Sequence, residues 1–243
     1  MYAQRIGALM DEVIESQAAA VRAAADLLVD SLSRDGVIQA FGTGHSEAIA
    51  MEIAGRAGGL VPTNRLTPRD LVQFGGASPD ILTPELERDP EVAHRVYELA
   101  PVEPQDVFVM ISNSGVNGST VELATLVKER GHPLIAITSV AHSSRMTSRH
   151  ASGRKLMDLA DVVLDNLAPY GDAVLPLPGG GAFGAVSTIT SALLAQLVVE
   201  QVVADLLDRG QEPPVYLSAN MAGGDEHNHA IEARYAGRIR RGA

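Results

Sequence analysis

The chain has 243 residues, of which 30 are Asp or Glu and 19 are Lys or Arg, so its formal net charge at pH 7 is −11. Such a charge repels polyanions, which excludes DNA and RNA as expected partners. The chain contains no cysteine, which excludes disulfides, thiolate zinc sites and cysteine nucleophiles. It shows neither the apolar core of a signal peptide nor a run close to the roughly 20 apolar residues of a membrane span. We therefore expect a cytoplasmic protein without a membrane partner.

The first part of the chain predicts a helix followed by a strand. Apolar residues recur at steps of three and four, at Ile6, Leu9, Met10, Val13, Val21, Ala24, Leu28 and Leu32. This spacing predicts one long amphipathic helix over residues 1–33, whose apolar stripe needs a partner surface. The apolar run 37–41 predicts the first strand, and a helix is expected over residues 46–57. Residues 60–62 predict a short second strand that ends at its proline.

The middle of the chain is irregular before a strong strand signal. Residues 67–105 contain several prolines and a charged stretch, which predicts a surface insertion or lid with a short helix near residues 92–99. The continuous apolar run at 106–111, DVFVMI, is typical of a parallel strand covered on both faces. The next helix is expected to begin with a capping box of Ser119 and Glu122 and to end at residue 131.

The rest of the chain continues this alternation. Strands are expected at residues 133–138 and 159–164, a largely apolar helix at 185–207 and a polar tail at 211–243. Alternating strands and helices predict a three-layer αβα sandwich around a five-stranded parallel sheet, in one domain with its core at about residues 30–210. In the flavodoxin-like strand order 2-1-3-4-5, a crevice opens at the carboxyl ends of strands 1 and 3.

Two polar loops follow the strands that flank this crevice. Residues 42–46 read GTGHS, and residues 112–117 read SNSGVN. Glycines let the backbone approach a ligand, hydroxyls donate hydrogen bonds, and a helix N-terminus favours an anion. Neither loop is a Walker sequence, and Glu47 stands where a dinucleotide fingerprint needs its last glycine. Either loop alone is compatible with a simple turn, but the pair predicts a site for a phosphate ester.

The two loops resemble the paired signatures of the SIS (sugar isomerase) domain family, and the later LADVVLD fits that family's fifth-strand region. The resemblance implies a flavodoxin-like sandwich that binds phosphosugars and usually forms a homodimer or tetramer. Carried onto this sequence, it assigns phosphate or substrate binding to Thr43, Gly44, His45, Ser46, Ser112, Asn113, Ser114 and Asn117.

The whole chain, including its C-terminal SANMAGGDEHNHA, is similar to a bacterial subgroup of this family to which N-acetylglucosamine-6-phosphate dehydratase belongs. That resemblance implies a hydro-lyase that removes water across C2 and C3 of N-acetylglucosamine 6-phosphate without a metal or cofactor. An aldose-ketose phosphosugar isomerase would share the loops and the base, so it stays an alternative. A phosphosugar sensor is another, although such regulators usually carry a helix-turn-helix domain and here only one helix precedes the first strand.

Four residues are candidates for the catalytic acid and base. Several relatives place a glutamate ten residues beyond the loop serine, but this sequence has Arg56 there. Glu47 and Glu52 are the nearby carboxylates, although contact with the helix dipole and an i,i+4 ion pair also explain them. Glu226 and His227 can complete their own or a neighbour's site, or can belong to a solvated tail. A metal is not expected there, because the spacing is not H-x-x-x-H and no distant third ligand is evident.

Overall fold

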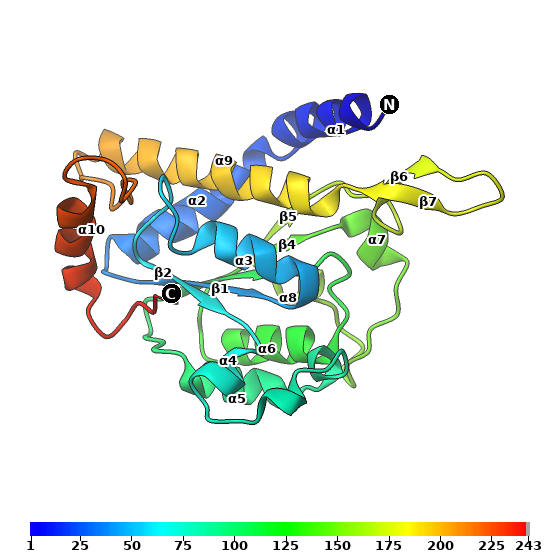
Figure 1. The fold of residues 1–243 in the computed structure, drawn as a ribbon, viewed down its shortest axis with the longest axis horizontal. Coiled ribbons are helices and arrows are strands. Elements are labelled where there is room, and N and C mark those ends of the chain that lie inside the picture. The colour runs from blue at the N-terminus through cyan, green and yellow to red at the C-terminus, as the bar shows by residue number, and fades with distance from the viewer. Residues whose placement is uncertain (242–243) are drawn as a thin grey trace.

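The computed structural model describes residues 1–241 of the chain. At its centre lies a parallel sheet with the strand order β2-β1-β3-β4-β5 (Figure 1). The strands are β1 (Ile38–Gly42), β2 (Thr63–Leu66), β3 (Val107–Ile111), β4 (Leu134–Thr138) and β5 (Val162–Asp165). Every residue of β1, β3 and β4 is buried, as expected for strands that are covered on both faces. The predicted sandwich and strand order are confirmed.

Helices cover both faces of this sheet. One face carries α1 (Tyr2–Ser16), α2 (Ala18–Leu32), α3 (Glu47–Ile53) and α9 (Ser187–Asp208), and the other carries α4 (Asp70–Gln73), α5 (Glu91–Leu99), α6 (Gly118–Glu129) and α8 (Leu156–Leu159). Successive side chains of a strand point to opposite faces. Val109 of β3 therefore packs in the core beneath α2 and α9, whereas Phe108 and Met110 pack in the core beneath α5 and α6.

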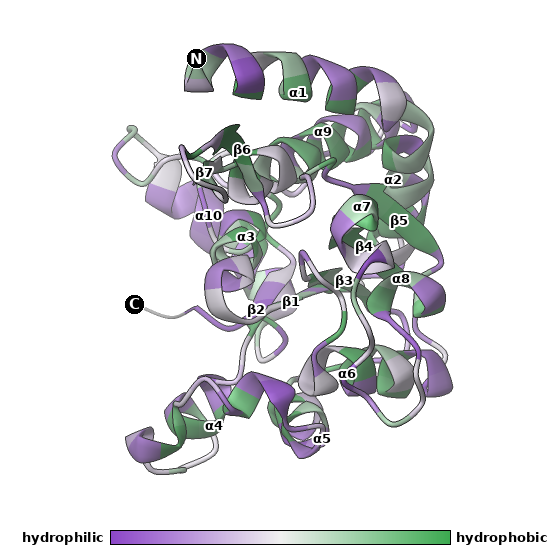
Figure 2. Ribbon diagram, turned by 90° about the vertical axis from the view of Figure 1, so that its right-hand side faces the viewer, coloured by the Kyte–Doolittle hydropathy of each residue, from purple (hydrophilic) through white to green (hydrophobic). Residues whose placement is uncertain are grey.

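The predicted N-terminal helix is divided in two. α1 ends at Ser16 and α2 begins at Ala18, because Gln17 leaves helical geometry with φ −97° and ψ 1°. The Gln17 side chain instead accepts a hydrogen bond from the backbone N–H of Asp165, at 2.9 Å. Figure 2 shows α1 as the outermost helix, stacked beyond α9. Only Val13 of α1 is buried, so most of the predicted apolar stripe on this helix is only partly covered.

Helix α9 departs from the expectation that no segment resembles a membrane span. Among the described residues it is the single helix long and apolar enough, by length and composition, to cross a membrane. In this structure it packs against α2 and α3, where Leu194, Val198 and Val202 are buried.

The prediction of the second strand was wrong by a few residues. β2 is Thr63–Leu66, and Leu60 makes an isolated antiparallel bridge with Val215 instead. β2 escaped notice because its sequence, TNRL, is polar for a buried strand. A polar residue can be buried in this strand because the C-terminal segment supplies its hydrogen bonds. Asn64 donates to the carbonyl of Arg238 at 2.8 Å, and its Oδ1 accepts from Arg240 N at 2.7 Å. The expected polar tail thus covers the exposed edge of the sheet.

The remaining elements lie at the two ends of the sheet. Strands β6 (Ala173–Pro176) and β7 (Ala182–Ala185) form an antiparallel hairpin that projects from the body on the same side as α7 (Val140–Ser144) (Figure 1). Helix α10 (Gly224–Glu232) lies at the opposite end, where the strands of the main sheet begin.

Candidate functional site

The first loop leaves the end of β1 as a tight turn. A Cβ at Gly42 would overlap the carbonyl of Ser46, and Gly44 has a φ of +55°, so both positions require glycine. The chain then passes through a 3-10 turn, Gly44–Ser46, directly into α3. His45 is exposed and Ser46 is half-buried. The loop therefore presents a ring and a hydroxyl at the carboxyl end of β1, as expected.

The second loop, residues 112–117, follows β3 and closes on itself. Gly115 has a φ of +64°, and its N–H donates to the hydroxyl of Ser112 at 3.1 Å. Asn117 is extended and precedes α6, whose first N–H groups have no carbonyl partner within the helix. The hydroxyl of Thr120, in the first turn of α6, is buried and has no hydrogen-bond partner among residues 1–241. Unused donors at a helix N-terminus favour an anion.

Arg149 is a residue of this loop region that sequence reasoning missed. Its Nη1 donates to Oδ1 of Asn117 at 3.0 Å, and its backbone N–H donates to the carbonyl of Val116 at 2.9 Å. A guanidinium beside the SNSGVN loop adds positive charge where the loop offers its donors. No sequence motif marks it, because it lies 32 residues beyond Asn117 and reaches the loop only through the fold.

Two pockets flank the first loop. The α9 pocket, of about 180 Å³, is lined by His45, Ser46, Ile49, Ile111, Asn113, Asn166, Asp172, Ser187, Thr188 and Ser191. Its walls are mainly amides and hydroxyls, and Asn166 Nδ2 lies 3.1 Å from both Asn113 Oδ1 and Ser191 Oγ. Asp172 accepts hydrogen bonds from the N–H and the hydroxyl of Ser187 and so caps α9. This pocket can bind a polyhydroxylated ligand through hydrogen bonds.

The carboxylate pocket, of about 170 Å³, lies on the other side of the loop and is lined by Thr43, Gly44, Glu47, Thr67, Pro68, Arg69, Leu82, Thr83, Pro84, Leu86 and Glu87. Glu47 Oε2 accepts from Arg69 Nε at 3.2 Å, and Arg65 lies 3.6 Å from its other oxygen. Glu87 Oε2 accepts from the hydroxyl of Thr43 at 3.2 Å. Two carboxylates thus face one small pocket, an arrangement that can supply an acid and a base.

Glu87 comes from the segment expected to be an insertion or lid. The 3-10 turn Leu86–Arg88 packs on the start of α6, where Ser119 Oγ donates to the Glu87 carbonyl at 2.6 Å. The predicted capping box was therefore wrong. Glu122 instead accepts hydrogen bonds from His94 at 2.7 Å and His150 at 2.6 Å. Burial raises the pKa of Glu122, but these hydrogen bonds outweigh burial and hold it below its usual value.

The other predicted acid-base residues lie elsewhere in this chain. Glu52 forms an ion pair with Arg56 and accepts a hydrogen bond from Gln196 of α9 at 2.8 Å, so it lines neither pocket. Glu226 is exposed on α10, and His227 Nε2 lies 3.0 Å from the carbonyl of Val215. α10 lies at the end of the sheet opposite to the two loops (Figure 1). In the described part of the chain, no group of three or more His, Asp or Glu side chains is arranged to hold a metal ion.

Comparisons with known proteins concern the family and the fold of the chain. The sequence profile of the SIS domain family matches residues 1–139. A UPF0309 protein of Listeria monocytogenes serovar 1/2a is 40% identical over 232 residues, which cover 95% of this chain and 94% of that protein.

Two solved structures illustrate the likeness in fold. The phosphoheptose isomerase of Neisseria gonorrhoeae has a TM-score of 0.52 at 21% identity, covering 83% of this chain and 94% of that one. The NanR protein of Vibrio vulnificus, in complex with ManNAc-6P, has a TM-score of 0.51 at 13% identity, covering 99% of this chain and 69% of that one.

Proposed function

This chain belongs to the SIS domain family, and from that premise we propose that it is an acid-base enzyme acting on a phosphosugar. The observation that carries the proposal is the second loop: a glycine-turned SNSGVN segment leads into the uncapped N-terminus of α6, beside a buried Thr120 hydroxyl without a partner in residues 1–241. Such a cradle suits a phosphate monoester, with Ser112, Ser114 and Asn117 as its side-chain donors.

The reaction we propose is dehydration of N-acetylglucosamine 6-phosphate. With the sugar ring open, a base removes the proton at C2, the C3–O bond breaks, and an acid protonates the departing oxygen so that water leaves. We assign Glu47 as the base and Glu87 as the acid, because Arg65 and Arg69 balance the charge of a Glu47 carboxylate whereas Glu87 faces the neutral hydroxyl of Thr43. The elimination itself rests on the resemblance of the whole chain to the dehydratase subgroup.

Thr43, Gly44, His45, Ser46 and Asn113 are the proposed sugar contacts, because they line the two pockets beside the cradle. Glu226 and His227 would reach such a site only from a second copy of the chain, because α10 lies at the far end of the sheet (Figure 1). Their role in catalysis therefore requires a homo-oligomer.

An aldose-ketose isomerase is the second candidate, supported by the shared fold of the Neisseria phosphoheptose isomerase. It would remove the same C2 proton and return it at C1 without losing oxygen. A phosphosugar sensor is the third candidate, because the structurally similar NanR protein was solved with ManNAc-6P. A sensor would bind the ligand without consuming it.

Proton NMR of the purified protein with N-acetylglucosamine 6-phosphate in D2O separates these candidates. Dehydration removes the C2 proton signal of this substrate and produces a vinylic signal. An aldose-ketose isomerase needs a hydroxyl at C2, so it is tested in parallel with glucose 6-phosphate, whose C2 proton signal it removes while a ketose forms. The double variant Ser112→Ala, Ser114→Ala should be inactive, since it loses the phosphate donors. Unchanged spectra at high concentrations of the wild-type enzyme would overturn the substrate assignment.

A further inference from the structure

A third hollow lies outside the edge strand β2 and shares no lining residue with the two pockets of the proposed active site. This arginine groove, of about 460 Å³, is lined by Met51, Ala54, Gly55, Arg56, Arg65, Gln73, Phe74, Arg240 and Arg241. Its volume is more than twice that of the α9 pocket and falls in the range of about 300–1,000 Å³ that small-molecule sites occupy. Four of its nine lining residues are arginines and none is acidic, although the chain as a whole carries a charge of −11.

The two C-terminal arginines of the groove are fixed in place. Arg241 donates from Nη1 to the carbonyl of Thr63 at 2.8 Å, and its guanidinium lies 5.1 Å from the centre of the Tyr216 ring. The guanidinium of Arg240 lies 4.4 Å from the centre of the Phe74 ring. Arg241 also donates from Nε to the Tyr216 hydroxyl and from Nη2 to the Val61 carbonyl, so it supplies charge and not free donors. The cation–π contact of Arg240 orients its guanidinium without using its N–H donors.

Arg240 also carries unused hydrogen-bonding capacity. Its Nη1 is buried and has no partner among residues 1–241, and burial lowers the pKa of its guanidinium. A buried charged donor without a partner is costly, so such groups usually bind a ligand, an ion or water. This unpartnered donor is independent of the shape of the groove and points to an anion.

No carboxylate of residues 1–241 lines the groove, although carboxylates behind it balance part of its charge; Glu232 Oε1, for example, lies 3.5 Å from Arg241 Nε. Glu52 pairs with Arg56 but also accepts a hydrogen bond from Gln196, towards α9. Glu47 lies in the carboxylate pocket, on the far side of Arg65. Asp70 is fully buried, burial raises its pKa to about 6, and its carboxylate attracts Arg65 and Arg240 from behind the groove. The surface that a ligand would meet is therefore formed by arginine, amide, methionine and phenylalanine side chains.

We propose that the arginine groove binds a phosphorylated small molecule at a site separate from the SNSGVN cradle. Guanidinium groups match phosphate oxygens with paired N–H donors, which makes arginine the preferred residue for phosphate. The volume exceeds the need of bare phosphate, and the exposed side chains of Met51 and Phe74 supply apolar surface for the rest of the ligand.

The groove and the proposed active site share one side chain. Arg65 lines the groove and also lies 3.6 Å from Oε1 of Glu47. A phosphate in the groove competes with Glu47 for this guanidinium, and so changes the charge around the proposed base. The binding proposal does not depend on that coupling or on the proposed reaction.

Equilibrium dialysis with radiolabelled inorganic phosphate tests the proposal, because both sites should accept this probe. The wild-type chain should show two binding classes. Arg56→Gln and Arg240→Gln should each weaken one class by roughly tenfold or more, the effect of losing a charged hydrogen bond. The double variant Ser112→Ala, Ser114→Ala should weaken only the other class.

The control matched to Arg56→Gln is Arg34→Gln. Arg34 forms an i,i+4 ion pair with Asp30, as Arg56 does with Glu52. The control changes the net charge equally and should leave both classes intact. Arg240→Gln removes a buried Nη1 and can destabilise the fold. Arg56 is exposed, so Arg56→Gln tests the groove even if the Arg240 variant is unstable.

The proposal is overturned if the wild type shows a single class of phosphate sites that is lost in the serine variant. It is also overturned if Arg34→Gln and Arg56→Gln weaken phosphate binding equally. A single class that is lost in the arginine variants and kept in the serine variant supports the groove and contradicts the proposed active site instead. The two failures are therefore distinguishable. Repeating the dialysis with excess unlabelled glucose 6-phosphate shows whether the groove class accepts a phosphate ester, and failure to displace the label there also contradicts the proposal.

Discussion

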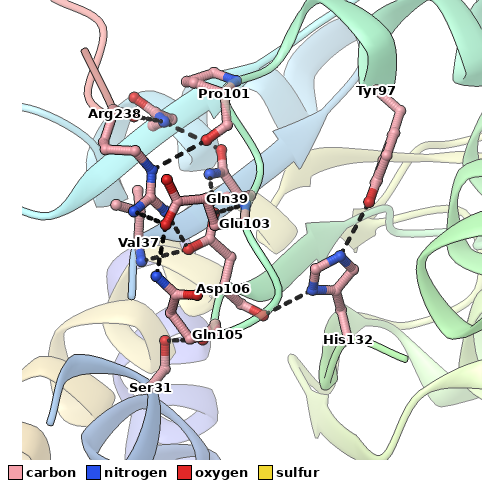
Figure 3. A network of polar contacts seen from close by, with 11 residues as sticks. Ser31, Val37, Gln39, Tyr97, Pro101, Glu103, Gln105, Asp106, His132 and Arg238 are labelled. Atoms are coloured by element: carbon pink, nitrogen blue, oxygen red, sulfur yellow. Dashed lines mark hydrogen bonds and ion pairs between the residues drawn. The ribbon is translucent and has the colours of Figure 1, made fainter. Parts of the chain in front are cut away.

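The two ends of the same sheet differ in how completely their polar groups are satisfied. At the amino end, the carboxylate of Asp106 is fully buried yet accepts from Val37 N at 2.9 Å, Gln39 Nε2 at 2.8 Å, Glu103 N at 3.1 Å and Arg238 Nη2 at 2.6 Å. Figure 3 shows these groups converging on one carboxylate. Next to it, the ring of His132 lies between the Asp106 carbonyl and the hydroxyl of Tyr97 (Figure 3). Burial lowers the pKa of this ring.

At the carboxyl end, several buried polar groups are not satisfied within the described residues. The hydroxyls of Thr120 and Ser143 and one oxygen of Asp70 are buried without a hydrogen-bond partner among residues 1–241. Buried polar groups normally find partners, so unpaired ones indicate where a ligand, an ion or water would bind. At the amino end the buried polar groups around Asp106 are satisfied within the chain and stabilise the fold, whereas at the carboxyl end part of the hydrogen-bonding capacity is unused among residues 1–241.

The largest effect should come from breaking the satisfied end. Arg238→Met leaves the buried Asp106 carboxylate without its cationic partner, which should lower the free energy of unfolding by about 3–5 kcal/mol. Urea denaturation measures this directly. The control is Arg234→Met, which removes an exposed ion pair with Asp35 at 3.5 Å and should cost less than about 1 kcal/mol. Equal losses in the two variants would contradict the special role of Asp106.

A smaller effect of opposite sign is expected at Asp70, the buried carboxylate of the other end. Its folded pKa, about 6, lies above the usual 3.8 because burial disfavours the charge. The folded state then holds the proton more tightly, so this group lowers the free energy of unfolding as the pH rises from about 4 to 6. The shift corresponds to about 3 kcal/mol, at roughly 1.36 kcal/mol per pH unit.

Asp70→Asn should therefore raise the free energy of unfolding relative to the wild type by up to about 3 kcal/mol at pH 8, and by much less near pH 4. The asparagine oxygen can still accept from Thr67 N, as the aspartate does at 3.3 Å. Urea denaturation at pH 4, 5, 6 and 8 gives the profile. Asp80→Asn, at an exposed aspartate, serves as the control and should show no comparable gain. A stability difference independent of pH would show that Asp70 is not the titrating group.

The sequence predicts features that depend on neighbouring residues, but not those that depend on contacts between residues far apart along the chain. β3 and β4 were predictable because continuous apolar runs such as VFVMI are buried on both faces by local rules alone. The two loops were predictable because glycines and hydroxyls must follow the strand directly. β2 was not, since its polar Asn64 is satisfied by residues 174 and 176 positions later.

The proposed acid-base residues show the same limit. Glu47 was predictable as a carboxylate next to the first loop, and the structure places it in the carboxylate pocket. Glu87 was not, because it reaches Thr43, 44 positions earlier, only through the packing of its 3-10 turn on α6. Arg149 reaches Asn117 in the same long-range way. Neither contact leaves a spacing or a motif in the sequence.

The smallest effect on stability should come from the unsatisfied end itself. Ser114 is half-buried in the SNSGVN loop, and within residues 1–241 its hydroxyl makes no hydrogen bond. Ser114→Ala should therefore change the free energy of unfolding by less than about 0.5 kcal/mol. It should nevertheless weaken binding of N-acetylglucosamine 6-phosphate by roughly tenfold, the cost of one hydrogen bond to a charged group.

Isothermal titration calorimetry and urea denaturation of the same samples measure both quantities. Ser144→Ala is the control, because the Ser144 hydroxyl donates to the carbonyl of Val140 at 2.7 Å and lies on α7, outside both pockets. It should leave binding unchanged. If the carboxyl end of the sheet binds a ligand and the amino end stabilises the fold, the Ser114 hydroxyl should contribute to affinity and not to stability. If Ser114→Ala lost stability and kept its affinity, the carboxyl end would be as structural as the amino end, and the phosphate cradle would have to lie elsewhere.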